Sequence, residues 1–247
     1  MKLKILQWNI WYKENPKKIS EEILRFDPDI VCAQELMQNL PNNIDTAKTI
    51  KEITKFNSFY KESETWDNRP DKTSQGNAIF SKYPFVSTSF KYVNDPVHNP
   101  LNASVEGRVY LESVFKINGR KLIVGTTHLS YSHRFKIDNR RKNEAKILKN
   151  ILSSNKEDFI FCGDLNAIPS SYTIKEISKV DNLKNFGPNV TEPTWTTKPF
   201  DYKGFKEDKL NWRLDYVFGT NNLNVLKSEI LKTDYSDHLP VLVEIEI

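Results

Sequence analysis

An aspartate and an asparagine stand two positions apart, directly after a strongly apolar segment of this chain. The segment covers residues 158–162 and predicts a buried strand that breaks at Gly163. Asp164 and Asn166 follow, and both side chains can project from the same side while the chain is still extended. A carboxylate and a carboxamide at a strand end are suited to handling a metal, a water or a phosphate. The simpler alternative is an Asx turn that only shapes the loop.

Polar residues end or follow several other apolar segments in the same way. They are Asn9, Glu35, His128, Asp215 and the pair Asp237-His238. Taken singly, each can be an edge cap, a turn residue or a core histidine satisfied by a neighbour. Their recurrence favours a functional site over separate structural roles, because a carboxylate in an apolar strand is costly unless a metal, a histidine or an arginine compensates its charge.

The elements that must position these residues follow from apolar patterns and turn signals. We expect helices at about residues 16–26, 44–56, 138–152 and 170–179. Asn118-Gly119 stands between two long apolar runs and predicts a β-hairpin. Polar stretches at about residues 63–74 and 94–102 predict surface loops, and a long irregular region is expected at residues 182–211.

Roughly ten strands with interspersed helices predict an α/β protein. The single hairpin pattern favours two mainly antiparallel sheets packed face to face, with helices outside. No linker-like composition interrupts the sequence, so residues 1–247 are expected to form one domain.

Composition excludes a disordered chain and suggests a compartment. Hydrophobic residues make up 38% of the 247 positions, which is enough for a packed core, and a formal charge of +4 is compatible with an anionic substrate. The N-terminus is polar too early for a signal peptide, and no apolar run approaches membrane-spanning length. Cys32 and Cys162 lie in predicted buried strands. We therefore expect reduced thiols, a cytoplasmic location and no stable membrane association.

Seven short motifs occur in order along nearly the whole sequence. They are Gln7-Trp8-Asn9-Ile10, Gln34-Glu35, Gly76-Asn77-Ala78-Ile79-Phe80-Ser81-Lys82-Tyr83-Pro84, Thr127-His128-Leu129, Gly163-Asp164-Leu165-Asn166, Arg213-Leu214-Asp215-Tyr216 and Ser236-Asp237-His238-Leu239-Pro240. This series resembles the endonuclease/exonuclease/phosphatase superfamily, the DNase-I-like fold. The resemblance implies a four-layer α/β sandwich and divalent-metal-dependent cleavage of a phosphoester.

The resemblance also implies a metal site. Glu35 would be the principal Mg²⁺ ligand, assisted by Asn9 and Asp237, and Mn²⁺ is an alternative ion. This set agrees with the preference of Mg²⁺ for few carboxylates and for waters that the substrate phosphate can replace. Asn77 and Arg108 are weaker candidates for phosphate contacts, and a structural role for either is at least as good an interpretation.

Five further residues receive catalytic roles from the same resemblance. Asp164 would orient or deprotonate the attacking water, and Asn166 would hold a phosphate oxygen. His238 would contact the scissile phosphate or serve as acid or base, with Asp215 fixing its tautomer. His128 would donate to the transition state or to the leaving oxygen.

Two features separate this chain from the abasic-site endonuclease branch. Ile10-Trp11-Tyr12 follow Asn9 where that branch typically continues with Asn-Gly, and His128 stands where that branch places a tyrosine. Both are more similar to the DNase, sphingomyelinase and deadenylase-type branches. In pancreatic-type DNases this histidine pairs with a glutamate. No such glutamate is matched near Gln75, so the partner of His128 stays open.

The leading hypothesis is a monomeric, Mg²⁺-dependent phosphodiesterase acting on nucleic acid. Basic residues at 133–136 and 140–142 can track a phosphate backbone or form a solvated helix face. Aromatic residues of the 194–212 segment can stack on unpaired bases, close over the core or dip into a lipid interface. They include Trp195, Phe200, Tyr202, Phe205 and Trp212.

Other functions stay open at this point. A phospholipid phosphodiesterase of sphingomyelinase type would predict export, and a phosphatase acting on a small phosphoester is a further alternative. A non-catalytic binding module on the same fold is disfavoured, because the full set of chemistry-bearing residues is intact. The sequence does not choose among DNA, RNA, lipid and small phosphoester.

Overall fold

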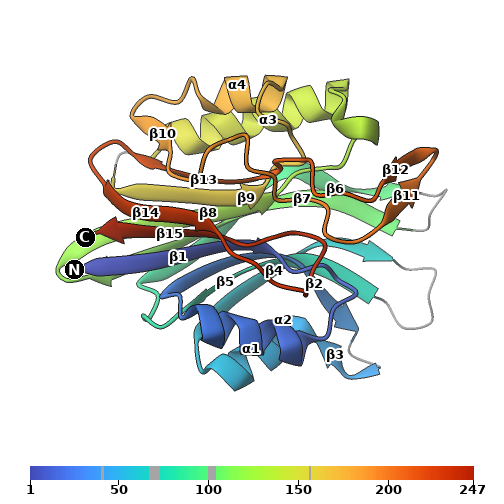
Figure 1. The fold of residues 1–247 in the computed structure, drawn as a ribbon. Helices are drawn as coiled ribbons and strands as arrows, with labels where there is room; N and C mark the ends of the chain where they lie inside the picture. The colour runs from blue at the N-terminus through green and yellow to red at the C-terminus, as the bar shows by residue number, and fades with distance from the viewer. Residues whose placement is uncertain (40–41, 67–72, 100–103, 156) are drawn as a thin grey trace.

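The N-terminal strand β1 (Lys2–Asn9) lies inside the principal sheet, between a parallel β2 (Ile30–Asn39) and an antiparallel β15 (Val241–Glu246). The computed structural model describes residues 1–39, 42–66, 73–99, 104–155 and 157–247. The two ends of the chain lie side by side (Figure 1), joined by a hydrogen bond from Ile247 N to Met1 O at 2.8 Å. The first and last strands therefore support the same part of the sheet.

Thirteen strands form one hydrogen-bonded sheet within the described residues. The remaining strands are β3 (Ile44–Asp45), β4 (Asn57–Trp66), β5 (Thr73–Ser81), β6 (Ser87–Asn99), β7 (Ser104–Ile117), β8 (Arg120–His128), β9 (Phe159–Asp164), β10 (Leu183–Asn185), β13 (Asp215–Thr220) and β14 (Asn224–Ile230). Their order is β10-β13-β9-β8-β7-β4-β5-β2-β1-β15-β14, with β3 beside β2 and β6 beside β7. Only β1–β2 and β8–β9 run parallel in this part of the chain.

The predicted α/β class is confirmed, whereas the expected pair of separate sheets is replaced by one continuous hydrogen-bonded path. β4 and β7 pair only through residues 64–66 and 104–106, at one end of each strand. On either side of this narrow join the two halves of the sheet share an apolar core. Ile5 of β1 and Val124 of β8 belong to the same buried cluster. The sequence pattern could not predict the short β4–β7 pairing, which joins the two expected sheets into one.

Two helices cover the outer side of each half of the sheet (Figure 1). They are α1 (Pro16–Phe26) and α2 (Thr46–Thr54) on the β1–β2 half, and α3 (Asn139–Ser153) and α4 (Tyr172–Ile177) on the β8–β9 half. Each begins where a side-chain oxygen accepts a backbone N–H, which satisfies an orphan donor of the first turn. The capping residues are Asn15, Asp45, Asp138 and Ser171. All four predicted helices are confirmed, with α2 and α4 shorter than expected.

The hairpin predicted at Asn118-Gly119 joins β7 to β8. Both turn residues have positive φ, 50° and 80°, as a tight hairpin turn with matched twist requires. The prediction that the next strand breaks at Gly163 is wrong, because β9 continues through Asp164. A Cβ on Gly163 would lie 2.6 Å from Thr127 O, so glycine is needed here for close strand pairing rather than for a turn.

The two polar stretches predicted as surface loops are largely strand. β4 continues to Trp66, β5 starts at Thr73, and β6 extends to Asn99. The rest of the predicted loops, residues 67–72 and 100–102, lies outside the described residues. Cross-strand pairing overrides the polar composition, and all nine residues of β5 are buried. The exposed edge strand β14 was not predicted, because few of its side chains face the core.

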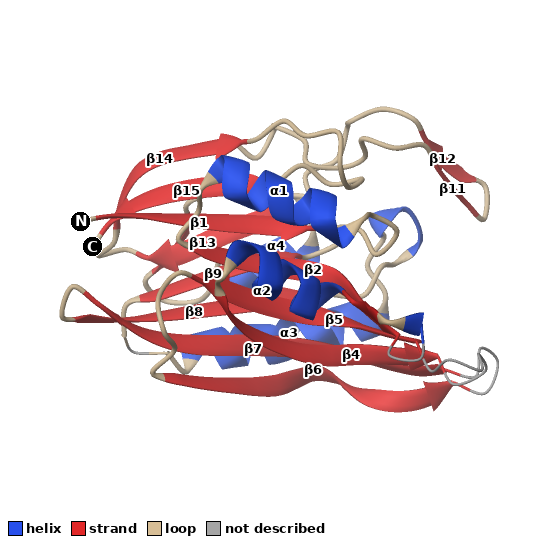
Figure 2. Ribbon diagram, turned by 90° about the horizontal axis from the view of Figure 1, so that it is seen from below, coloured by secondary structure: helices blue, strands red, loops and turns tan. Residues whose placement is uncertain are grey.

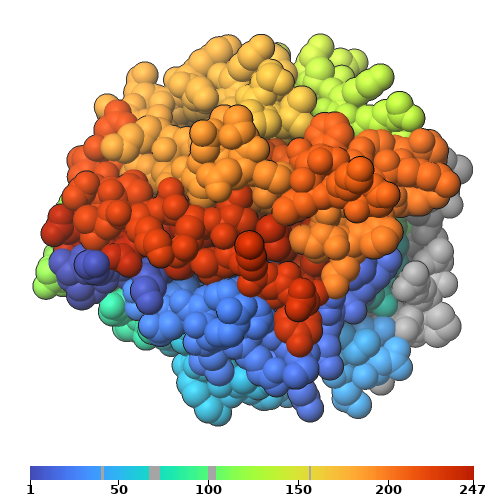
Figure 3. Space-filling model, viewed as in Figure 1, coloured from blue at the N-terminus to red at the C-terminus, as the bar shows by residue number. Residues whose placement is uncertain are grey.

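The 182–211 region is mainly irregular, as predicted. It contains β10 and a separate two-stranded sheet of β11 (Phe200–Tyr202) and β12 (Phe205–Glu207), which projects at one end of the molecule (Figure 2). This region lies against the segment that precedes β15 (Figure 3), through backbone bonds such as Thr197 N to Asp237 O at 3.0 Å. Cys32 and Cys162 are buried and free. No helix within the described ranges is long and apolar enough to cross a membrane.

Candidate active site at the strand ends

The eight residues predicted for catalysis or metal binding lie at one edge of the sheet, around one pocket. Strand register explains this convergence, because the ends of parallel strands meet at the same edge. His128 at the end of β8 is level with Asp164 at the end of β9, and Asp164 is level with Asp215 on β13. The pocket has a volume of about 220 Å³. Its lining includes Tyr12, Glu35, Gln75, Arg108, His128, Asp164, Asn166, Trp195, Asp237 and His238.

Asp215 and His238 form a buried pair at the floor of the pocket. His238 Nδ1 lies 2.8 Å from Asp215 Oδ2, and the other carboxylate oxygen accepts a bond from Gln7 Nε2 at 3.2 Å. Burial lowers the pKa of His238, but the carboxylates of Asp215, Asp164 and Asp237 outweigh it and raise the pKa well above its usual value. The His238 ring is therefore doubly protonated, and the surrounding carboxylates stabilise this charged form.

Asp164 is the hub of the hydrogen-bond network. Its Oδ2 accepts from Asn9 Nδ2 at 2.9 Å and its Oδ1 accepts from Asn166 N at 2.8 Å. The Nε2 atoms of His128 and His238 lie 3.5 and 3.6 Å from Oδ2, one on each side. A carboxylate held by an amide and flanked by two imidazoles has a fixed orientation toward the pocket.

His128 differs from His238 in its protonation. Its Nε2 lies 3.0 Å from Asn166 Nδ2, which also donates to Leu129 O at 3.0 Å. Burial is the main reason that the pKa of His128 falls to about 3, despite the nearby carboxylate of Asp164. The ring is thus neutral, and Nε2 accepts the Asn166 bond in this amide orientation. Asn166 supplies a neighbour for His128, where the sequence left the partner open.

Glu35 and Asp237 form the second half of the pocket, where like charges meet. Burial and the field of Asp237 raise the pKa of Glu35 to about 7, and burial raises the pKa of Asp237 as well. Asn9 Nδ2 donates to Glu35 Oε1 at 3.0 Å, and Trp195 Nε1 donates to Asp237 Oδ2 at 3.1 Å. Asp237 Oδ1 is buried and has no hydrogen-bond partner within the described residues.

These two carboxylates fit a hard divalent cation. A buried carboxylate oxygen without a partner, beside two carboxyl groups whose pKa values are raised mainly by burial, is what an oxygen site for a cation would present. Asn9 presents Nδ2 to Glu35 and its Oδ1 accepts from Trp11 N at 3.1 Å. An oxygen ligand from Asn9 would therefore require the amide to turn over.

A different acidic group, Asp164 with Asp215 and His238, has ligand atoms within 4.8 Å of one another. Every oxygen of its two carboxylates already accepts a hydrogen bond, from Asn9, Asn166, Gln7 or His238. A cation there would have to break those bonds. Three oxygens of the Glu35–Asp237 pair accept hydrogen bonds as well, but Asp237 Oδ1 is buried without a partner in the described residues, so this pair is the better fit to a cation.

The sequence profile of the Endonuclease/Exonuclease/phosphatase family matches residues 6–238, nearly the entire chain. The chain belongs to this family. No curated protein matches its sequence.

Solved structures of the family have the same fold. An endonuclease/exonuclease/phosphatase from Beutenbergia cavernae DSM 12333 is 20% identical with a TM-score of 0.80, over 100% of this chain and 72% of its own. The mannosyl-6-phosphatase of Bacteroides thetaiotaomicron VPI-5482 is 17% identical with a TM-score of 0.72, over 99% of this chain and 100% of its own. D. rerio TDP2 complexed with single-strand DNA product is 17% identical with a TM-score of 0.67, over 100% of this chain and 99% of its own. At such identities the likeness shows the fold alone.

The two weaker phosphate-binding candidates lie in different places. Arg108 lines the pocket, where its guanidinium pairs with Glu64 and its Nε donates to Ser130 Oγ at 3.0 Å. Asn77 is buried and donates to Val109 O at 3.1 Å, and it is not among the residues that line the pocket. Its observed contact is structural.

Arg141 was predicted within a basic surface segment, but only 2% of it is exposed. Its Nη2 donates to Leu165 O at 2.5 Å, and its Nη1 pairs with Glu144 at 3.2 Å. It therefore supports the backbone between Asp164 and Asn166. Helical spacing carried this signal: Arg141 lies four and seven positions before Ala145 and Leu148, on the same buried face of α3.

Backbone strain occurs at the rim of the pocket. Five of the twelve non-glycine residues with positive φ in the described chain lie there, in an uncommon conformation that occurs preferentially at functional sites. They are Trp11 (57°), Glu35 (64°), Phe135 (54°), Asn166 (44°) and Ser236 (67°). Glu35 lies where the pairing of β2 with β5 shifts register between Ala33 and Leu36. A bulge of this kind re-aims a side chain, here the glutamate that faces Asp237.

The aromatic residues of the 194–212 segment are mostly packed together. Trp195 and Phe205 are buried in a cluster with Phe135 and Leu214, against which Phe200 and Trp212 pack. The interpretation that they form an open stacking platform is therefore wrong for Trp195 and Phe205. Closure of the long loop over the core, the alternative, agrees with this packing.

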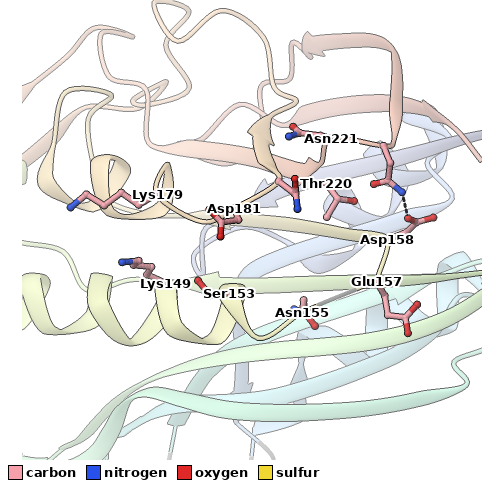
Figure 4. Close-up of a pocket in the computed structure, with 11 residues that line it drawn as sticks. Lys149, Ser153, Asn155, Glu157, Asp158, Lys179, Asp181, Thr220 and Asn221 are labelled. Atoms are coloured by element: carbon pink, nitrogen blue, oxygen red, sulfur yellow. Dashed lines mark hydrogen bonds between the residues drawn. The ribbon is translucent and has the colours of Figure 1, made fainter.

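A larger hollow of about 660 Å³ lies at the opposite end of β9, between the end of α3 and the β13–β14 turn (Figure 4). Its carboxylate Asp158 is already paired with Arg120 Nη2 at 2.5 Å and bonded to Asn222. Lys149 and Lys179 at its rim pair with Glu176. Because its lysines and Asp158 are already paired, and it brings no histidine to its lining, this hollow is the weaker candidate for a catalytic site.

Proposed function

We propose that this protein is a divalent-metal-dependent phosphodiesterase that acts on nucleic acid. The observation that carries the proposal is Asp164, held by Asn9 between two histidines of opposite protonation, beside the uncompensated Glu35–Asp237 pair. Family membership supports phosphoester hydrolysis. The excess positive charge of the chain favours a polyanionic substrate.

Glu35 and Asp237 would hold Mg²⁺, or Mn²⁺ as the alternative, with Asn9 assisting. When bound, the cation supplies positive charge that offsets the charge developing on the phosphate oxygens. The rest of the chemistry falls to groups of the chain itself.

Asp164 is placed to accept a proton from the attacking water, because its carboxylate is fixed and faces the pocket. Water oxygen bonds to phosphorus as the bond to the leaving oxygen breaks. His238, protonated and oriented by Asp215, is placed to donate its Nε2 proton to that side of the reaction. His128 and Asn166 contribute neutral contacts to the phosphate oxygens. Arg108 adds a cation at the wall of the same pocket.

A phosphatase acting on a small phosphoester is the second candidate. The modest pocket volume of about 220 Å³ and the similarity to a mannosyl-6-phosphatase structure favour it. Phospholipid cleavage remains a third possibility, which no feature of the pocket favours. A cytoplasmic location and a monomeric state stay predictions from the sequence.

The test is hydrolysis by the purified protein with Mg²⁺. Single- and double-stranded DNA, RNA, sphingomyelin and mannose 6-phosphate are compared, with Asp164→Asn as the inactive control. We expect EDTA-sensitive cleavage of nucleic acid that Asp164→Asn lacks. Cleavage of the lipid or of the sugar phosphate alone would overturn the assignment to nucleic acid, and activity that survives both EDTA and Asp164→Asn would overturn the mechanism.

A further inference from the structure

A second hollow of about 260 Å³ adjoins the catalytic pocket, and none of the roles above uses it. It is lined by Tyr12, Met37, Trp66, Thr73 and Gln75. Tyr12 and Gln75 line the catalytic pocket too, so the two hollows share a wall. Whatever occupies the second hollow can remain attached to a phosphoester in the first.

Strand register explains why this hollow lies beside Glu35. Leu36 packs in the cluster under α1 and α2, so Met37 points to the opposite face, two positions beyond Glu35 along β2. Two strand residues span about 7 Å. Met37 is level with Gln75 on β5, and Trp66 at the end of β4 is level with Thr73. Three neighbouring strands thus place these side chains together.

The lining combines aromatic surface with an unused amide. Tyr12 is 45% exposed, and its backbone N–H, not its side chain, contacts Glu35 Oε2 at 3.3 Å. Gln75 is only 8% exposed, and its carboxamide makes no hydrogen bond to any described residue. Its amide atoms are not among the fully buried atoms without a partner, and the residue lines both hollows, so the carboxamide is free to bond to a ligand there. Thr73 Oγ1 already accepts from Asn39 Nδ2 at 3.1 Å.

We propose that this hollow is a nucleobase subsite for the nucleotide next to the scissile phosphate. The assignment rests on the proposed phosphodiesterase function. The rings of Tyr12 and Trp66 offer stacking surfaces, and the Gln75 carboxamide offers one donor and one acceptor to a base edge. A base in a duplex is stacked and paired, so the subsite selects single-stranded or frayed ends.

Other ligand chemistries fit the hollow less well. A sugar needs partners for several hydroxyl groups, whereas the hollow offers one free carboxamide beside an engaged threonine hydroxyl. An acyl chain would leave the Gln75 amide buried without any partner. Lys13 Nζ lies 5.5 Å from the centre of the Tyr12 ring and adds positive charge near this wall, which favours an adjoining phosphate.

The experiment compares two chromogenic diesters, thymidine 5′-(4-nitrophenyl) phosphate and methyl 4-nitrophenyl phosphate, which differ in the nucleoside. Trp66→Ala and Tyr12→Ala should each lower kcat/KM for the nucleoside diester about 10-fold, the size of one lost stacking contact. Trp66→Ala, whose side chain lines only the second hollow, should leave the methyl diester within about twofold. Tyr12→Phe keeps the ring and should retain activity. Phe90→Ala removes an exposed aromatic that lines neither hollow and serves as the matched control.

Equal losses on both diesters in Trp66→Ala, or no loss on the nucleoside diester, would overturn the subsite. If the wild-type protein hydrolyses neither diester, the phosphodiesterase function fails, and binding then tests the subsite separately. Anisotropy of a labelled oligothymidylate would be measured with wild type and Trp66→Ala. Weaker binding by Trp66→Ala supports the subsite, and equal binding by the two proteins sinks it.

Discussion

Two buried pairs of ionisable side chains, Asp215–His238 and Glu35–Asp237, lie at the pocket, and the charges balance within only the first of them. Asp215 is matched by the protonated His238 and by Gln7, so its charge is balanced by the fold itself. Glu35 faces Asp237, and one oxygen of Asp237 has no partner in the described part of the chain. The balanced pair costs the fold little and fixes geometry. The repulsion within the unbalanced pair is relieved by uptake of a proton, which the raised carboxyl pKa values reflect, or by a cation from outside.

The largest expected effect comes from removing a charge on the unbalanced side. Glu35→Gln should lower Mg²⁺-supported activity by about 10³-fold, because the principal cation ligand is lost. In metal-free buffer the same variant should be at least as stable as wild type, because repulsion with Asp237 is removed. Activity assays and urea unfolding measure the two quantities. Glu157→Gln, at an exposed pair with Lys121, is the surface control.

The opposite result is expected on the balanced side. Asp215→Asn leaves a buried imidazolium without its counter-charge, and breaking such a pair costs about 3 kcal/mol of unfolding free energy. Asp201→Asn, in an exposed pair with Lys206, should cost less than about 1 kcal/mol. If metal-free Glu35→Gln and Asp215→Asn lost the same stability, the distinction between the two pairs would be wrong.

The site was more predictable from sequence than the sheet that carries it. Asn9, Glu35, His128 and Asp164 each follow an apolar run, so their local sequence reports a strand end. The join between β4 and β7 depends on three residue pairs that are distant in sequence and mix polar with apolar side chains. No local pattern encodes such a contact. The same holds for Trp195, whose indole N–H reaches Asp237 across 42 positions.

Composition misled where burial depends on tertiary partners. Arg141 has the sequence environment of a basic surface helix, yet it is buried with Glu144 and donates to Leu165 O, between Asp164 and Asn166. The polar segments of β4 to β6 were expected to be loops because of their polar composition. Their strands form through pairing with neighbours that single-sequence periodicity does not reveal.

Stabilisation by Mg²⁺ should be a smaller effect, and it should depend on the Glu35–Asp237 pair and not on Asp164. Mg²⁺ at ten times its dissociation constant should stabilise the wild type by about 1.4 kcal/mol, because it binds the folded state. Thermal unfolding with and without Mg²⁺ measures this as a rise in Tm. The rise should disappear in Asp237→Asn and persist in Asp164→Asn, whose carboxylate is engaged by Asn9 and Asn166. Loss of the rise in Asp164→Asn alone would move the cation to the Asp164 side.

The last effect concerns the protonation of the two histidines, His238 in the balanced pair and His128 outside it. The pKa of His128 is lowered to about 3, against about 6.5 in an unfolded chain. Between these values the unfolded state binds a proton that the folded state does not. This group therefore destabilises the fold progressively as pH falls below about 6.5, by up to about 1.4 kcal/mol per pH unit.

His128→Gln should remove that contribution, so the unfolding free energy should fall less steeply from pH 6.5 to 5 in the variant than in wild type. Urea unfolding at four pH values in EDTA gives the slopes. His133→Gln removes an exposed histidine and controls for the loss of a titratable group as such. An unchanged slope in His128→Gln would mean that the folded protein protonates His128 as readily as the unfolded chain. The pocket would then hold two charged imidazoles, and His238 would lose its distinction as the proton donor.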